Sequence, residues 1–139
     1  MANFITNTRM LNTDLAALLL RLTVGGMFIF HGWMKIDNYH TFLPMFTDII
    51  GIGTKLSYHL LIFAEFVCGI FVAAGFLTRL TVIPILVAMI IAYFIAHKND
   101  GFLMKMLPFV YIWLTLAIWV AGSGKYSVDH LLFRKKNNP

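Results

Sequence analysis

The sequence predicts an all-α integral membrane protein: an up-down bundle of four helices, with a short amphipathic interfacial helix between the first two. Composition is the first observation behind this class. Of the 139 residues, 60% are hydrophobic and 12% are charged, and the mean hydropathy is +0.80. A soluble domain carries about 25% charged residues, because it needs a solvated surface. The second observation is that the hydrophobic residues fall in long runs, each near the roughly 20 residues that a helix needs to cross the hydrocarbon core.

The predicted membrane-spanning helices cover about residues 15–35, 56–77, 80–97 and 103–121, in one membrane domain of residues 1–139. Lipid supplies no water for backbone polar groups, which favours helices over open strands. The single cysteine, Cys68, lies inside the second run and excludes an intramolecular disulfide or a CxxC centre. The polar start and the long first run predict no cleaved signal peptide. A basic tail, residues 122–139, is expected to follow the last helix.

The distribution of lysine and arginine predicts the orientation in the membrane. With four spans, both termini share one side with the turn at Thr78–Arg79. That side collects Arg9, Arg79, Lys125, Arg134, Lys135 and Lys136, and the other collects Lys35, Lys55, Lys98 and Lys105. The positive-inside rule therefore places both termini in the cytoplasm. The net charge of +5 suits anionic lipid headgroups, and no basic groove with interleaved aromatics indicates nucleic acid.

The long connection between the first two spans, residues 36–55, contains one apolar helical face. Its members follow the spacing i, i+3, i+4, i+7: they are Phe42, Met45, Phe46 and Ile49. Gly51 and Gly53 are expected to end this helix. A short amphipathic helix beside two spans is expected in the membrane interface. It would be either a lid packed on the bundle, which is the simpler interpretation, or a gate over a lipid-accessible site.

Three ionisable residues within the first two spans are the candidate functional residues: Arg21, His31 and Glu65. Such groups are costly in a membrane and need a partner. From the helical rise, Arg21 lies about 21 Å, Glu65 about 12 Å and His31 about 6 Å from the outer ends of their helices. Two interpretations follow. In the first, Arg21 and Glu65 form a buried ion pair that only sets helix register. In the second, His31, Glu65 and Arg21 form a catalytic polar relay that exchanges protons beside a bound ligand.

The neighbours of these residues indicate that both polar groups face the bundle interior. Arg21 shares a helical face with Gly25, Phe28 and Gly32, and Glu65 shares one with Leu61, Cys68, Gly69 and Val72. Small residues on such faces let a second helix approach closely. We therefore expect the first two spans to pack against each other along these faces.

Histidines and aromatic residues provide weaker candidates. Four histidines lie near the predicted outer side, but no HxxH or HxxxH pair shares a helix, so no metal site is predicted and haem is disfavoured. Tyr93, Trp113 and Trp119 are candidate cofactor-binding residues, because a flat ligand such as a quinone could stack on them. Their alternative role is ordinary anchoring at the membrane interface.

Several motifs resemble those of a known family. The first span carries Arg21-x-x-x-Gly25-Gly26-x-x-x-x-His31-Gly32-x-x-Lys35. Glu65 with Gly69 and the turn Gly75-x-x-Thr78-Arg79 follow in the second span, and Gly122-Ser123-Gly124-Lys125-Tyr126-Ser127-Val128-Asp129 follows the last. These motifs, in this order, are similar to those of the DoxX family, with Ser123 and Lys125 as variations in the final segment. The resemblance covers nearly the whole chain and implies a small four-helix membrane protein.

For function, the resemblance implies a quinone-linked membrane subunit of a redox or sulfur-metabolism system in a bacterial inner membrane. Family members are linked to a thiosulfate:quinone oxidoreductase and to a complex with superoxide dismutase and a sulfurtransferase. Membrane or periplasmic redox proteins would then be the partners. The alternative is a non-enzymatic scaffold, in which Arg21–Glu65 is structural and Arg79 and the basic tail contact a partner or anionic lipid. Four spans without broken helices disfavour a solute carrier, and glycine-lined faces are compatible with a homodimer.

Overall fold

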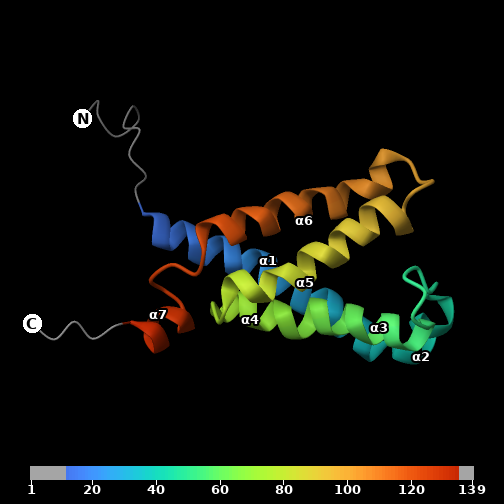
Figure 1. Cartoon of the computed structure of the whole chain (residues 1–139), viewed down its shortest axis with the longest axis horizontal. Helices are drawn as coiled ribbons and strands as arrows, with labels where there is room; N and C mark the ends of the chain where they lie inside the picture. The colour runs from blue at the N-terminus through green and yellow to red at the C-terminus, as the bar shows by residue number, and fades with distance from the viewer. Residues whose placement is uncertain (1–11, 135–139) are drawn as a thin grey trace, which may run out of the picture.

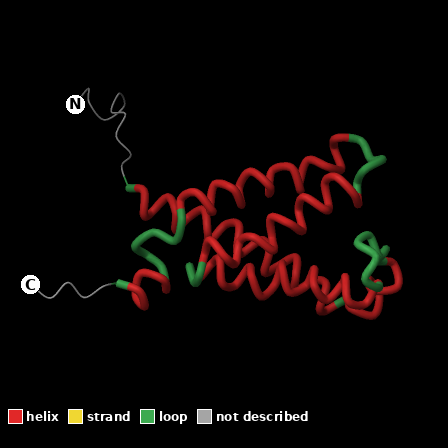
Figure 2. The backbone as a smooth tube through the Cα atoms, in the orientation of Figure 1, coloured by secondary structure: helices red, strands yellow, loops and turns green. Residues whose placement is uncertain are grey.

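The computed structural model describes residues 12–134, and within them four long helical segments run back and forth along one axis (Figures 1 and 2). The first is α1, Thr13–Asp37. The second is continuous through α3 (Thr54–Ile62), the π-helical turn η2 (Phe63–Val67) and α4 (Cys68–Ala74). The third joins α5 (Thr78–Ile91) to the π-helical turn η3 (Ala92–Ala96), and the fourth is α6, Phe102–Ala121. All four are long and apolar enough to cross a membrane, so the predicted all-α membrane bundle is confirmed.

The bundle has two distinct ends. At the terminal end, α1 begins, α4 turns into α5, and the chain leaves α6 (Figure 1). The loop end carries the connection between α1 and α3 and the turn between η3 and α6. Asn12 caps α1 by accepting the Leu15 N–H at 2.9 Å, and Gly75 ends α4 in the left-handed conformation, φ 77°. These are the residue types that helix starts and ends favour.

Close packing joins α1 to the second span along the glycine face predicted above. A Cβ atom built on Gly25 would lie 2.7 Å from the backbone nitrogen of Ala73, and one on Gly32 would lie 2.6 Å from the Cβ of Phe66. Only glycine permits so close an approach of two helices. The central apolar cluster draws on all four spans: Val24, Phe28, Cys68, Val72, Val82, Ile85, Met89, Tyr111 and Ile118.

Toward the loop end, the α5–α6 hairpin diverges from α1 and α3 (Figures 1 and 2). Between α3 and α5 lies a cavity of about 410 Å³, named here the α3–α5 groove. Its walls are apolar apart from Ser57, and Phe46 and Ile49 of the connection also line it. Both π-helical turns contribute to it, η2 through Ala64 and η3 through Ala92. Such turns within α-helices frequently mark functional positions.

The connection differs from the predicted helix at residues 42–49. Helical structure comes earlier and is shorter, as α2 (Tyr39–Phe42) and the 3₁₀ turn η1 (Leu43–Met45), and the chain is irregular from Phe46.

Asp48 explains where this helix ends. Its carboxylate accepts the N–H of Gly51 at 3.0 Å, the N–H of Gly53 at 2.6 Å and the hydroxyl of Ser57 at 2.7 Å. A side chain that bonds nearby backbone groups competes with the helix. These hydrogen bonds, that from Ser57 foremost, hold the pKa of Asp48 below its usual range.

The segment after α6, predicted as a basic tail, contains a short helix within the described residues. Residues 122–127 run across the terminal end of the bundle, and α7 (Val128–Phe133) follows (Figure 1). Ser127 caps α7, since its hydroxyl accepts the His130 N–H at 3.1 Å. Arg9, Lys135 and Lys136, which contributed to the predicted orientation, lie outside the described residues.

Candidate functional site

Glu65 lies in the π-helical turn η2 and is paired with Lys35 from the last turn of α1. Glu65 Oε2 is 2.6 Å from Lys35 Nζ, and the two side chains are 6% and 23% exposed. A carboxylate this deeply buried needs such a partner, because removing a charge from water costs several kcal/mol. The pair links the loop-end half of α1 to the second span.

The expected Arg21–Glu65 pair is not formed. Arg21 is 1% exposed, and its guanidinium donates to two backbone carbonyls instead: Nη2 to Tyr126 O at 2.6 Å and Nη1 to Ala73 O at 3.4 Å. The reason is that helical side chains lean toward the N-terminus of their own helix. In α1 this directs Arg21 toward the terminal end and Lys35 back into the bundle. In the antiparallel second span, Glu65 leans toward the loop end, where Lys35 lies.

Arg21 therefore connects three parts of the chain: α1, the end of α4 and the segment after α6. Gly75 packs directly on the guanidinium, and a Cβ there would overlap Arg21 Nη1. Its φ of 77° also favours glycine. The structure thus places Arg21 apart from Glu65, in a contact that organises the terminal end.

His31 lies one helical turn before Lys35 on the same face of α1. Its ring packs edge-on against Tyr111, with centroids 6.4 Å apart, and its Nε2 is buried without a hydrogen-bond partner among the described residues. His31 and Lys35 both line a pocket of about 280 Å³ beneath α2 and η1, named here the loop-end pocket. The other lining residues are Met34, Phe42, Met45, Phe46 and Tyr58. The pocket thus brings His31 to the same wall as Lys35, which is paired with Glu65.

Three residues of this region are absent from the sequence-based candidates: Lys35, Tyr58 and Tyr111. Tyr58 is 1% exposed, and its hydroxyl donates to Lys35 O at 3.1 Å. Tyr111 is 6% exposed and packs against Phe28 in a tilted arrangement, with ring centroids 4.7 Å apart and an interplanar angle of 54°. For Lys35 a signal was present: it follows His31 by four residues, and the lean of its side chain points it inward. Tyr58 and Tyr111 depend on helix packing, which the sequence pattern does not specify.

The aromatic candidates lie elsewhere. Tyr93 sits in η3 with Lys105 Nζ 5.8 Å from its ring centroid. Trp113 and Trp119 are 60% and 47% exposed on α6. None of the three lines the loop-end pocket or the α3–α5 groove. Their exposure on apolar helices is typical of residues that face lipid.

Two of the other histidines, His59 and His97, are held in local polar contacts. His59 Nε2 is 2.8 Å from the Tyr39 hydroxyl, and His97 Nδ1 is 2.7 Å from Asp100 Oδ2. Within residues 12–134, no three side chains of His, Cys, Asp or Glu converge as a metal site would require.

Comparison with known proteins agrees with this architecture. Residues 16–98 match the DoxX family model. The inner membrane protein YqjF of Escherichia coli (strain K12) is 33% identical over 129 residues, which cover 88% of this chain and 95% of that protein. No solved structure matches the chain. With the family model matching more than half of its length, and with four helices suited to span a membrane, the chain belongs to the DoxX family of multi-pass membrane proteins.

Proposed function

We propose that this chain is a quinone-linked membrane subunit of a redox or sulfur-metabolism system in a bacterial inner membrane. In this proposal the loop-end pocket holds the quinone headgroup. One observation carries it: Lys35, which is paired with the buried Glu65, lines the same pocket as His31, whose Nε2 has no partner among the described residues, and this pocket shares Phe46 with an apolar groove. Ionisable groups placed inside membrane helices generally mark a site.

The dimensions and chemistry of the two cavities fit a ring with an apolar tail. The loop-end pocket, about 280 Å³, is close to the lower limit of small-molecule sites and suits a single ring. The α3–α5 groove, about 410 Å³, provides an apolar channel for an isoprenoid tail. Phe46 lines both cavities, so they lie next to each other, and we propose that one ligand extends past Phe46 from one to the other. At the headgroup, His31 and Lys35 supply N–H donors for carbonyl oxygens.

A quinone bound here would supply two-electron, two-proton acceptor chemistry, with both protons drawn in the end from the aqueous phase at the loop end. In the proposed arrangement, His31 donates a hydrogen bond from Nε2 and holds a proton near one oxygen. Glu65 holds the Lys35 side chain in place at the pocket wall through their ion pair. In this proposal a partner redox protein in or beside the membrane supplies the electrons.

We also propose that the termini lie in the cytoplasm, so that the loop-end pocket opens on the periplasmic side. The lysine and arginine counts support this orientation, with six residues on the terminal side and four on the other. Lys35 is one of those four, and its pairing with Glu65 removes it from the membrane surface. Periplasmic redox proteins would then reach the pocket side.

The proposal is tested by measuring the quinone that co-purifies with the full chain in mild detergent. Wild type is expected to be enriched in quinone relative to phospholipid, compared with the source membrane. The variant His31→Phe removes the ring N–H donor while keeping an aromatic ring, and should lose most of this enrichment. His97→Phe is the matched control, since His97 lies at the same end and its ring bonds Asp100 outside the pocket. Absence of enrichment in wild type, or equal retention by His31→Phe, contradicts the proposal, and a Soret band would indicate haem instead.

The environment of Arg21 favours a second candidate function, a non-enzymatic assembly subunit. Among the described residues, the hydrogen bonds of this buried cation all go to backbone carbonyls, and they join α1 to the end of α4 and to the final segment. It is therefore a structural element, and the final segment that it holds could present a surface to a partner or to a second copy. Retained fold and assembly in Glu65→Gln, with loss of quinone, would favour the redox role. If the wild-type protein carries no quinone and the variant Arg21→Met no longer assembles, the scaffold role is favoured.

A further inference from the structure

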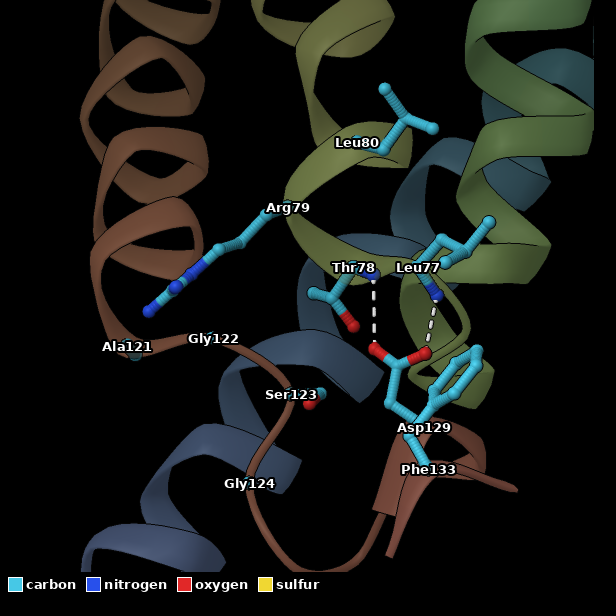
Figure 3. A pocket seen from close by; sticks show the side chains of 10 residues that line it. All are labelled: Leu77, Thr78, Arg79, Leu80, Ala121, Gly122, Ser123, Gly124, Asp129 and Phe133. Atoms are coloured by element: carbon cyan, nitrogen blue, oxygen red, sulfur yellow. Dashed lines mark hydrogen bonds between the residues drawn. The ribbon is translucent and has the colours of Figure 1, made fainter. Parts of the chain in front are cut away.

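A third cavity lies at the terminal end of the bundle, at the opposite end from the loop-end pocket. It measures about 560 Å³ and is named here the terminal-end cavity. One wall is the start of α5, with Thr78 and Arg79, and the other is the segment Gly122–Gly124 that follows α6 (Figure 3). From this arrangement we infer a binding site for the phosphate group of an anionic membrane phospholipid.

Arg79 provides the positive charge of the cavity. Its side chain extends from α5 toward the end of α6, where Nε donates to Trp119 O at 3.2 Å (Figure 3). That contact fixes the guanidinium while leaving its terminal N–H groups for a ligand. Gly122 has no side chain to cover them, and a Cβ there would lie 3.5 Å from Arg79 Nη2. A guanidinium held in this way suits the oxygens of a phosphate, which it can bind through two parallel hydrogen bonds.

Thr78 supplies a second, independent sign of a ligand. Its side chain lines the cavity and is 1% exposed, yet its hydroxyl has no hydrogen-bond partner among the described residues. Buried hydroxyls are nearly always satisfied, so an unpaired one requires an explanation. Figure 3 shows the hydroxyl directed into the space between Asp129 and the Gly122–Gly124 segment. A phosphate oxygen in that space would pair with it.

Asp129 also lines the cavity, but its charge is already engaged. Its two oxygens accept the N–H of Leu77 at 2.7 Å and the N–H of Thr78 at 3.3 Å. These donors belong to the start of α5, where the helix dipole offsets a negative charge. The described residues at this end carry more cations than carboxylates: Arg21, Arg79, Lys125 and Arg134 against Asp14 and Asp129. This excess of positive charge favours an anionic ligand.

The surroundings indicate a lipid rather than a soluble phosphate compound. The cavity lies at the ends of α5 and α6, where headgroups meet the hydrocarbon core if these helices span the membrane. Leu80 and Phe133 line it and are 63% and 65% exposed. On α7, Leu131 and Leu132 are 79% and 62% exposed beside them. Exposed apolar side chains around a cationic cavity match the acyl chains and the phosphate of one amphiphile.

The test is a titration of the full chain in neutral detergent, with phosphatidylglycerol or phosphatidylcholine added and the unfolding temperature as the readout. Phosphatidylglycerol is expected to raise the unfolding temperature of wild type more than phosphatidylcholine, because a ligand stabilises the state that it binds. Arg79→Gln should raise the apparent dissociation constant for phosphatidylglycerol about tenfold, the loss of one charge-assisted contact. Lys125→Gln is the matched control: it removes the same charge from the same end but outside the cavity, and should change the constant less than about twofold.

If Arg79→Gln does not fold, the variant Thr78→Val tests the same site. It removes only the unpaired hydroxyl and should weaken phosphatidylglycerol binding about fivefold, the value of one hydrogen bond. Equal weakening by Arg79→Gln and Lys125→Gln would overturn the site in favour of diffuse charge attraction. Unchanged affinity in Thr78→Val would overturn the assignment of its hydroxyl. A stabilisation by sodium phosphate equal to that by phosphatidylglycerol would overturn the lipid as ligand.

Discussion

The pairing of Lys35 with Glu65 predicts a large and specific coupling in a double-mutant cycle. The variants are Lys35→Met, Glu65→Gln and their combination. At the observed N–O distance of 2.6 Å and an effective dielectric constant of about 20, the attraction is about 6 kcal/mol before desolvation is subtracted. Removing one partner of a buried pair costs about 3–5 kcal/mol. Because Lys35 is 23% exposed, the expected loss of stability in Lys35→Met is at the lower end of this range, about 3 kcal/mol.

The double variant should be less destabilised than the sum of the single variants, with a coupling of about 2–3 kcal/mol. The measurement is the free energy of unfolding in mixed detergent micelles, with helix content followed by circular dichroism. The control cycle combines Arg21→Met with Glu65→Gln. Because Arg21 contacts carbonyls of Ala73 and Tyr126 and not Glu65, its coupling should stay below about 0.5 kcal/mol. A larger coupling for Arg21 than for Lys35 would refute the side-chain directions described above.

Three further predictions concern other parts of the bundle. Gly32→Ala should destabilise the protein by about 1–3 kcal/mol through steric overlap with the facing helix. The same change at the open position Gly26 should be neutral or stabilising by up to about 1 kcal/mol, as thermal unfolding would show, and equal effects would contradict the packing. The lowered pKa of Asp48 stabilises the folded connection above the ordinary aspartate pKa, and this contribution should disappear as pH falls through the folded-state value. Amide exchange at Gly53 should accelerate there, and Asp48→Asn should show no such step. Asp129→Ala should cost about 1 kcal/mol, since it removes the side-chain cap of α5, and an unchanged unfolding temperature would contradict that role.

The sequence alone was sufficient to predict the four long helices and the helix faces along which the first two pack together. Runs of about 20 apolar residues permit few structures other than membrane helices, because lipid leaves no partner for an unpaired backbone group. The faces of Arg21 and Glu65 were also predictable, since residues at positions i, i+4 and i+7 share one side of a helix. Gly25, Phe28 and Gly32 are all buried against the second span as expected.

Local periodicity was insufficient in the connection. The spacing of Phe42, Met45, Phe46 and Ile49 predicted a helix over residues 42–49, whereas the helical turns end at Met45. The decisive contacts come from Asp48, which bonds residues three, five and nine positions ahead. A hydrophobic pattern carries no information on such side-chain hydrogen bonds.

What the sequence determined by itself is the presence of Arg21 and Glu65 within the first two spans and the helical face that each occupies. Which charges meet was decided by the tertiary structure. The antiparallel packing of α1 against the second span, together with the lean of each side chain toward its helix N-terminus, pairs Glu65 with Lys35 and not with Arg21. The same packing turns Arg21 toward the final segment, 105 residues further along the chain at Tyr126. Contacts at that separation depend on the folded path of the whole chain, which no local pattern encodes.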